Sequence, residues 1–212
     1  NGQPVFPALS PNDEFYHHSL PALDATGKPV IELGRAIESN KVLIDEPAVL
    51  VSKLNPRKPR VAVVVPKADE RHCASTEFMC FVPRDRRDDL RYWAYYLGST
   101  GFSVRLQRVA IGSTNSHTRA SPSEVMRWVV PNPSHEEKRA IAGVLESLDT
   151  TIRQTEAIIA KLKQVKQGLL HDLLTRGIDA NGELRPPQSE APHLYKASPL
   201  GWIPVEWDTA TL

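Results

Sequence analysis

The chain has 212 residues, of which 41% are hydrophobic and 24% are charged, a composition that fits a folded, soluble protein. Its longest apolar run, Val61 to Val65, is too short to cross a membrane, so a membrane partner is not expected. The net charge of +1 is divided unevenly, with +3 over residues 1–133, +1 over 134–176 and −3 over 177–212. Binding to nucleic acid would therefore depend on local clusters of basic residues.

Residues 1–133 predict a compact mixed α/β domain. Runs rich in Val, Ile and Phe predict strands, and two amphipathic segments predict helices. The expected strands are Val30–Leu33, Ala48–Leu54, Val61–Val65, Phe78–Val82 and Val125–Val130. The expected helices are Asp88–Leu97 and Phe102–Ile111. Many loops are rich in proline, as is typical of a scaffold whose loops carry the function.

A basic turn follows the second expected strand. It contains four basic residues and one amide within eight positions, without an acidic residue: Lys53, Asn55, Arg57, Lys58 and Arg60. The cations could neutralise DNA phosphates, and Asn55 could read or orient a base. The alternative is a solvated basic turn without a partner.

A polar loop follows the second expected helix. Almost all of its side chains are short hydrogen-bonding groups, and the candidates for DNA contact are Ser113, Thr114, Asn115, His117 and Arg119. Asn, His and Arg are residue types that read base edges, whereas Ser and Thr can contact phosphates. A flexible loop without a role would have a similar composition.

Residues 134–177 predict one long helix. Ser134 and Glu137 form a capping-box pattern at its start, and Gly177 follows Arg176 as a left-handed cap. Apolar residues recur in alternating steps of four and three, which is the pattern of a coiled coil. They are Ile141, Leu145, Leu148, Ile152, Ile159, Leu162, Leu169 and Leu173, and Thr155 and Lys166 occupy the two remaining positions. A long helix lying against its own domain is the alternative.

Residues 178–212 predict a linker followed by the truncated start of another domain. The acidic, proline-bearing stretch 178–196 is expected to be exposed, and the aromatic segment 198–207 is too short to fold alone. The chain begins at Asn1 and not at Met, so we expect that its natural N-terminus is missing.

Motifs for catalysis are missing from the sequence. It has no glycine-rich phosphate loop, nucleophile elbow or zinc-protease helix, and we therefore expect a non-catalytic chain without a cofactor of its own. His17 and His18 could bind a metal, but no third ligand is apparent. Cys73 and Cys80 are expected to be buried free thiols, which favours the cytoplasm.

Taken together, these segments resemble the specificity subunits of type I restriction–modification systems. In residues 1–133 the resemblance depends on the runs at 15–24, 38–41, 49–57 and 75–78, on Gly112-Ser-Thr and on Arg119. In the helix region it depends on Val130-Pro-Asn-Pro, Glu137-Lys-Arg-Ala-Ile and Lys166-Gln-Gly-Leu-Leu, followed by Gly201-Trp-Ile-Pro-Val-Glu-Trp. The order and spacing of these motifs, and no single one of them, make the match specific.

The resemblance implies a sequence-specific DNA-binding subunit of an α+β fold, with a target-recognition domain at 1–133, a spacer helix at 134–177 and the start of a second recognition domain at 178–212. Family members read one half of a bipartite double-stranded target with each recognition domain. Their two long helices pack antiparallel and bind methyltransferase subunits, which use S-adenosylmethionine, while motor–endonuclease subunits join for restriction. Enzymatic activity and cofactor are therefore expected only in the partners.

The sequence departs from the family pattern because it has one recognition domain and one long helix. The missing second helix predicts self-association through residues 135–176, with antiparallel pairing, so that two identical domains read an interrupted palindrome. The competing hypothesis is a structural coiled-coil adaptor without affinity for DNA. A third hypothesis, a nuclease or methyltransferase in its own right, would need motifs that the sequence lacks.

Overall fold

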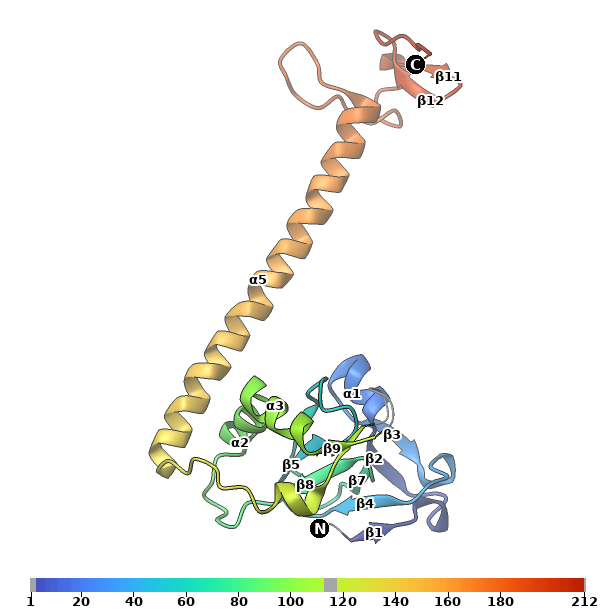
Figure 1. Ribbon diagram of the computed structural model, residues 1–212. Coiled ribbons are helices and arrows are strands. Elements are labelled where there is room, and N and C mark those ends of the chain that lie inside the picture. Colours follow the sequence, from blue (N-terminus) through green and yellow to red (C-terminus); the bar gives the residue numbers. More distant parts are fainter. Residues whose placement is uncertain (1–2, 113–117, 212) are drawn as a thin grey trace. The chain divides into compact units, whose positions relative to one another are not determined.

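A computed structural model describes residues 3–112 and 118–211 (Figure 1). The chain divides into two compact units, Asn1–Glu146 and Ser147–Leu212, which are described separately below. The helices are α1 Leu20–Thr26, α2 Leu90–Gly98, α3 Thr100–Arg108, α4 Pro122–Val125 and α5 His135–Arg176, with short 3-10 turns at Pro7–Leu9, Gly34–Ala36 and Pro192–Leu194. None of the described helices is long and apolar enough to span a membrane.

Two sheets form the frame of the first unit (Figure 1). The five-stranded sheet has the order β1-β4-β7-β2-β3, in which only β2 and β7 run parallel. Its strands are β1 Pro4–Val5, β2 Glu14–His18, β3 Val30–Leu33, β4 Lys41–Ile44 and β7 His72–Ser75. The antiparallel three-stranded sheet has the order β6-β5-β8, built from β5 Ala48–Ser52, β6 Val61–Val64 and β8 Phe78–Phe81.

Strand β5 is the centre of the domain because all five of its residues are buried. Successive side chains of a strand point to opposite faces, so Val49 and Val51 pack with Leu97, Phe102 and Leu106 of α2 and α3. On the other face, Ala48 and Leu50 pack into a cluster with Ile44, Val64, Ala74 and Phe78. The continuous apolar run of β5 thus joins two hydrophobic clusters.

The region after α3 differs from the sequence-based expectation. The helix predicted through Ile111 ends at Arg108, and β9 Ala110–Ile111 pairs with β10 Arg119–Ala120. The strand predicted at 125–130 is wrong, because Pro122 starts the short helix α4 and no strand follows it up to residue 134. Val129 is 88% exposed, whereas Trp128 packs edge-on against Phe102. This apolar stretch therefore belongs to the connection between α4 and α5, and Trp128 anchors that connection to α3.

The strands β2, β4 and β7 escaped the sequence analysis because each of them buries a polar side chain. Lys41 in β4, His18 in β2 and His72 in β7 are each less than 8% exposed. Their presence hides the alternation of apolar and polar residues by which a strand is recognised. The expected strands at 30–33, 48–54, 61–65 and 78–82 do form, although three of them end one or two residues early.

The long helix α5 has the predicted bounds and caps. The Ser134 hydroxyl accepts a hydrogen bond from the Glu137 backbone amide, and the Glu137 carboxylate accepts one from the Ser134 amide at 3.0 Å. Gly177 follows the last helical residue with a φ of +65°. Its 42 residues correspond to about 63 Å at 1.5 Å per residue.

The segment after α5 contains more structure than the expected linker. Arg185 is 9% exposed, accepts hydrogen bonds from Arg176 with its carbonyl and donates a side-chain bond to the Arg176 carbonyl at 3.2 Å. A hairpin of β11 Tyr195–Ser198 and β12 Gly201–Pro204 follows, and the Tyr195 hydroxyl donates to the Pro186 carbonyl at 2.6 Å. Arg185 thus holds the residues after the helix against its last turn.

Candidate nucleic-acid interface

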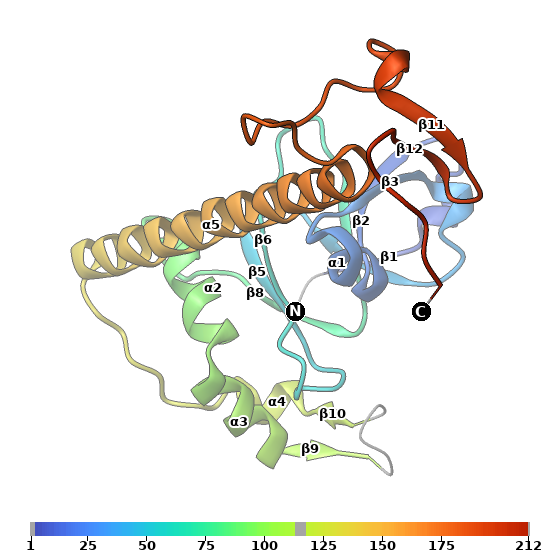
Figure 2. The same ribbon diagram turned by 90° about the horizontal axis from the view of Figure 1, so that it is seen from above.

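The basic turn and the strand β10 lie side by side, although they are far apart in sequence (Figure 2). Leu54 forms an isolated β-bridge with Arg119, and the Asn55 amide donates to the Thr118 carbonyl at 2.9 Å. The Ala120 amide donates to the Lys53 carbonyl at 2.9 Å. The structure therefore brings part of both segments proposed for DNA contact onto one surface.

Internal hydrogen bonds define the shape of the turn. The Ser52 amide donates to the Arg60 carbonyl at 2.9 Å, which closes the turn at its base. Asn55 has a φ of +49°, a conformation that Asn adopts more readily than most residues. The Ser103 hydroxyl of α3 donates to the Pro56 carbonyl at 2.7 Å. The turn is therefore supported by a helix of the core.

Asp24 of α1 supplies the acidic charge that the basic turn lacks in sequence. Arg60 donates to both of its carboxylate oxygens, at 2.8 and 2.9 Å, and Lys58 lies 2.9 Å from one of them. Hydrogen bonds from Arg60, and then from Lys58, hold the pKa of Asp24 well below its usual range. Only 13% of the Arg60 side chain is exposed, so this cation serves the fold more than a ligand.

Arg119 has an acidic partner as well. Its guanidinium donates to Glu77, in the β7–β8 turn, through contacts of 3.0 and 3.1 Å. The hydrogen bond from the guanidinium raises the pKa of Arg119 above its usual value. Because the Arg119 side chain remains 47% exposed, it could exchange Glu77 for a phosphate or a base.

Lys53 and Arg57 have no ion-pair partner among residues 3–112 and 118–211, and Arg57 is exposed. The buried Oδ1 atom of Asn55 lacks a hydrogen-bond partner among the same residues. Arg108, at the end of α3, adds an exposed cation that the sequence analysis missed. Arg108 lies on the polar side of α3, opposite the buried Phe102 and Leu106. This helical spacing could have revealed it in the sequence.

Four of the candidate residues in the polar loop, Ser113, Thr114, Asn115 and His117, lie outside the described residues. The flanking strands β9 and β10 pair through Ala110 with Ala120 and Ile111 with Arg119. The second strand of this pair contacts the basic turn.

The two neighbouring histidines have different side-chain partners, and His18 belongs to a buried network. His18 contacts His72 at 3.0 Å between ring nitrogens, and His72 contacts Glu70 at 3.0 Å. His17 points to Glu32 instead, at 2.7 Å. Burial, and then the charge of His72, lowers the pKa of His18 to about 4. No group of three potential metal ligands occurs among the described residues.

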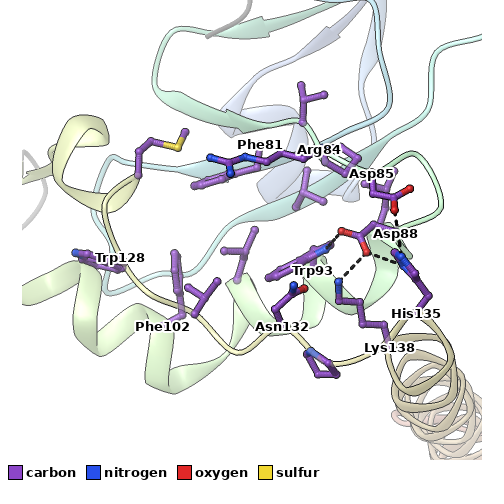
Figure 3. A pocket seen from close by; sticks show the side chains of 18 of the residues that line it. Phe81, Arg84, Asp85, Asp88, Trp93, Phe102, Trp128, Asn132, His135 and Lys138 are labelled. Carbon is purple, nitrogen blue, oxygen red and sulfur yellow. Dashed lines mark hydrogen bonds and ion pairs between the residues drawn. The ribbon is translucent and has the colours of Figure 1, made fainter.

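A cavity of about 570 Å³ lies where the first unit meets the start of α5 (Figure 3). Apolar side chains line most of it, among them the aromatic residues Phe81, Trp93, Phe102 and Trp128, and its polar end is formed by residues of the β8–α2 connection and of α5. There the Lys138 ammonium donates to Asp88 at 2.7 Å and lies 4.9 Å from the centre of the Trp93 ring. His135 contacts Asp88 at 3.0 Å and Asp85 at 3.2 Å. These contacts join the first turn of α5 to the domain.

Comparison with known proteins identifies the fold. No family model matches the sequence. One similar solved chain, from a study of complex assembly and conformational transition of the type I R-M system, is 21% identical with a TM-score of 0.65. Another, the HsdS subunit from Thermoanaerobacter tengcongensis, is 20% identical with a TM-score of 0.64.

Each alignment covers 88% of this chain but only 49% of the solved chain, so this chain spans about half the length of these proteins. The expected α+β architecture with one long helix is confirmed. The fold of this chain is thus similar to about half of that HsdS subunit.

Proposed function

We propose that this chain reads one half of a bipartite DNA target as a specificity subunit of a type I restriction–modification system. One observation supports this function most strongly: the basic turn and strand β10 lie together, with exposed Arg57 and Arg119 on adjacent segments. The fold shared with HsdS favours the same function. The chain itself is proposed to be non-catalytic.

The two kinds of side chain in this surface suit two kinds of contact. Lys53 and Arg57, which have no acidic partner among the described residues, are suited to phosphates and would set the position of the duplex. Arg119 carries the group that pairs with guanine edges, and Asn55 would pair with an adenine edge once its amide turns the buried Oδ1 atom outward. We propose that the loop between β9 and β10 contributes further base contacts.

We also propose that the chain acts in a complex with methyltransferase subunits and a motor–endonuclease subunit. One of the similar structures belongs to a study of type I R-M complex assembly. In such a complex, S-adenosylmethionine would bind to the methyltransferase and not to this chain. Titration calorimetry of the isolated chain with S-adenosylmethionine should give no binding heat, and saturable binding would contradict this division of roles.

Fluorescence anisotropy with labelled duplex DNA tests the DNA-binding function. The chain should bind with a strong dependence on salt, because each neutralised phosphate contributes a slope of about −0.9 in log K against log salt. Replacing Arg57, Asn55 and Arg119 together by Ala should abolish the preference between sequences. A chain that binds no duplex at 50 mM salt, alone or with a methyltransferase, would favour the adaptor without DNA affinity.

A further inference from the structure

The cavity beside the first turn of α5, with a volume of about 570 Å³, is far larger than a packing defect (Figure 3). Protein interiors contain few voids larger than a water molecule, whereas sites for small organic molecules have volumes of about 300–1,000 Å³. All of the lining residues lie between positions 49 and 138, within the first unit, and none of them is a proposed DNA contact. The cavity is therefore a candidate ligand site separate from the nucleic-acid interface.

Apolar side chains form both the inner wall of the cavity and part of its mouth. Val49 of β5 and Phe102 of α3 are 1% and 4% exposed, so the cavity reaches the hydrophobic cluster around β5. Val82 and Met126 line it as well, and they are 46% and 50% exposed. Apolar side chains that line a cavity and remain open to water are typical of a site for an apolar ligand.

Two indole rings in the wall carry a cation over one face. The Arg105 guanidinium lies 4.2 Å from the centre of the Trp128 ring, and the Lys138 ammonium lies 4.9 Å from that of Trp93. The negative potential of a ring face is offset by a cation, so an anion or an electron-rich ring is accepted more readily beside such a ring. The walls thus favour an aromatic ligand that is not itself a cation.

The acidic groups at the polar end of the cavity are already satisfied by the chain. Asp88 accepts hydrogen bonds from Lys138 at 2.7 Å and from the Trp93 indole at 3.2 Å. Asp85 accepts a hydrogen bond from the Arg87 guanidinium at 2.7 Å. Each carboxylate therefore has a cation of its own, and a cationic ligand would find no free acidic partner in this part of the cavity.

Two arginines at the cavity lack an acidic partner. Arg84 lines the cavity, is exposed, and forms no ion pair with any of residues 3–112 and 118–211. Arg105 donates to the Val129 carbonyl at 3.1 Å, and it too has no acidic partner in the described part of the chain. Asn132, which also lines the cavity, adds an exposed amide that can donate hydrogen bonds. The charge left uncompensated around the cavity is therefore positive.

We propose that this cavity binds a small planar aromatic anion. The ring of the ligand lies among the aromatic side chains, and its carboxylate or phosphate group accepts hydrogen bonds from Arg84. A guanidinium can donate two parallel hydrogen bonds to either group, which fixes the orientation of the ligand. The site goes beyond the proposed reading of DNA and does not depend on it, so failure of either proposal leaves the other intact.

Fluorescence titration of the full chain with anilinonaphthalene sulfonate, an aromatic anion that becomes fluorescent in apolar sites, measures binding. We expect saturable binding of one equivalent. Arg84→Gln should raise the dissociation constant about fivefold to tenfold, because a charge-assisted hydrogen bond at an exposed site is lost. Neutral phenylnaphthylamine, which lacks the anionic group, should bind equally to Arg84→Gln and to the unmodified chain.

Arg86→Gln is the matched control for this titration. It removes an exposed cation from the same connection, but Arg86 does not line the cavity, so the affinity for the sulfonate should stay unchanged. Absence of saturable binding overturns the proposal. Equal affinities of the Arg84→Gln and Arg86→Gln chains for the sulfonate would also overturn it.

Nuclear magnetic resonance of the indole N–H groups locates the bound sulfonate. The chain has four tryptophans, of which Trp93 and Trp128 line the cavity, whereas Trp202 and Trp207 belong to the second unit. The sulfonate should shift the signals of the first two and leave those of the other two in place. Shifts confined to Trp202 and Trp207, or equal shifts of all four signals, would put the anion outside the cavity and overturn the proposal.

Competition distinguishes the two anionic groups that the ligand could carry. Naphthoate offers a carboxylate, and adenosine monophosphate offers a phosphate on an aromatic base. Displacement of the sulfonate by one of them, with shifts of the same two indole signals, assigns the corresponding group, and displacement by both shows that the site accepts either group. If neither displaces the sulfonate at saturating concentration, the proposed class of ligand is wrong.

Discussion

The ammonium of Lys138 donates a hydrogen bond to Asp88 at 2.7 Å while only 2% of its side chain is exposed. This contact joins the first turn of α5 to the connection before α2. Burial raises the pKa of Asp88, but hydrogen bonds from Lys138 and Trp93 outweigh it, so that the pKa is lowered. The start of the long helix is thus part of the core of the first unit.

Breaking this buried pair should destabilise the first unit. Lys138→Met leaves the Asp88 carboxylate without its cation, and we expect a loss of about 3 kcal/mol in the free energy of unfolding. The double variant Lys138→Met/Asp88→Leu removes both charges and should recover most of the loss. Urea unfolding followed by circular dichroism measures both. Equal stability of Lys138→Met and the unmodified chain would show that the pair does not anchor the helix.

The cations of the basic turn should contribute unequally to DNA binding. Arg57→Ala should reduce the salt slope of DNA binding by about one unit, because Arg57 is free to neutralise a phosphate. Arg60→Ala should reduce it less, because Asp24 already holds that guanidinium. Lys67→Ala, which removes a cation from the β6–β7 connection, is the matched control. A larger effect at Arg60 than at Arg57 would place the DNA elsewhere.

Removal of Asp24 should strengthen binding to DNA. Asp24→Asn frees Arg60 and Lys58 from their acidic partner and removes one negative charge near the turn. We expect affinity for every duplex to rise several-fold and the salt slope to increase by about one to two units. Anisotropy titrations at several salt concentrations provide the comparison, and weaker binding by a folded Asp24→Asn chain would contradict this role.

His18 should make the fold sensitive to mild acid. Its pKa is about 4 in the folded chain and 6.5 for the ordinary side chain, so the folded state resists its protonation. The contribution of the neutral His18 to the free energy of unfolding is fully present above pH 6.5. It decreases by about 1.4 kcal/mol per pH unit as the pH falls to 4, which amounts to about 3 kcal/mol in total. Urea unfolding at pH 7.5 and 4.5 should show a smaller difference for His18→Gln. His193→Gln, in the second unit, should keep the full difference.

The long helix was the most predictable element, whereas the charge partners of the basic turn were not predictable. The capping box and the heptad repeat are local patterns, and they gave the bounds of α5 within one residue. Asp24 lies 36 residues from Arg60, and Glu77 lies 42 residues from Arg119. Such pairings depend on how strands and helices pack together, which a single sequence does not encode locally.

The same limit explains the errors in the domain. The strand expected at 125–130 has the right residue types, but the start of α4 at Pro122 and the packing of Trp128 on Phe102 decide its conformation. The proximity of the basic turn to β10 follows from the hydrogen bond between Lys53 and Ala120 of that strand and from the one between Asn55 and Thr118 just before it. The sequence predicted both segments as DNA contacts but gave no reason to place them together.

Selection of bound sequences from a pool of random duplexes tests the central claim most directly. The chain, at a concentration where it is saturated with DNA at low salt, should enrich a short defined sequence, and enrichment should be lost in the Asn55→Ala/Arg119→Ala variant. Arg57→Ala should weaken binding without changing the enriched sequence, since phosphate contacts carry no sequence information. Recovery of a random pool by the unmodified chain, despite tight binding, would show that it does not read DNA sequence.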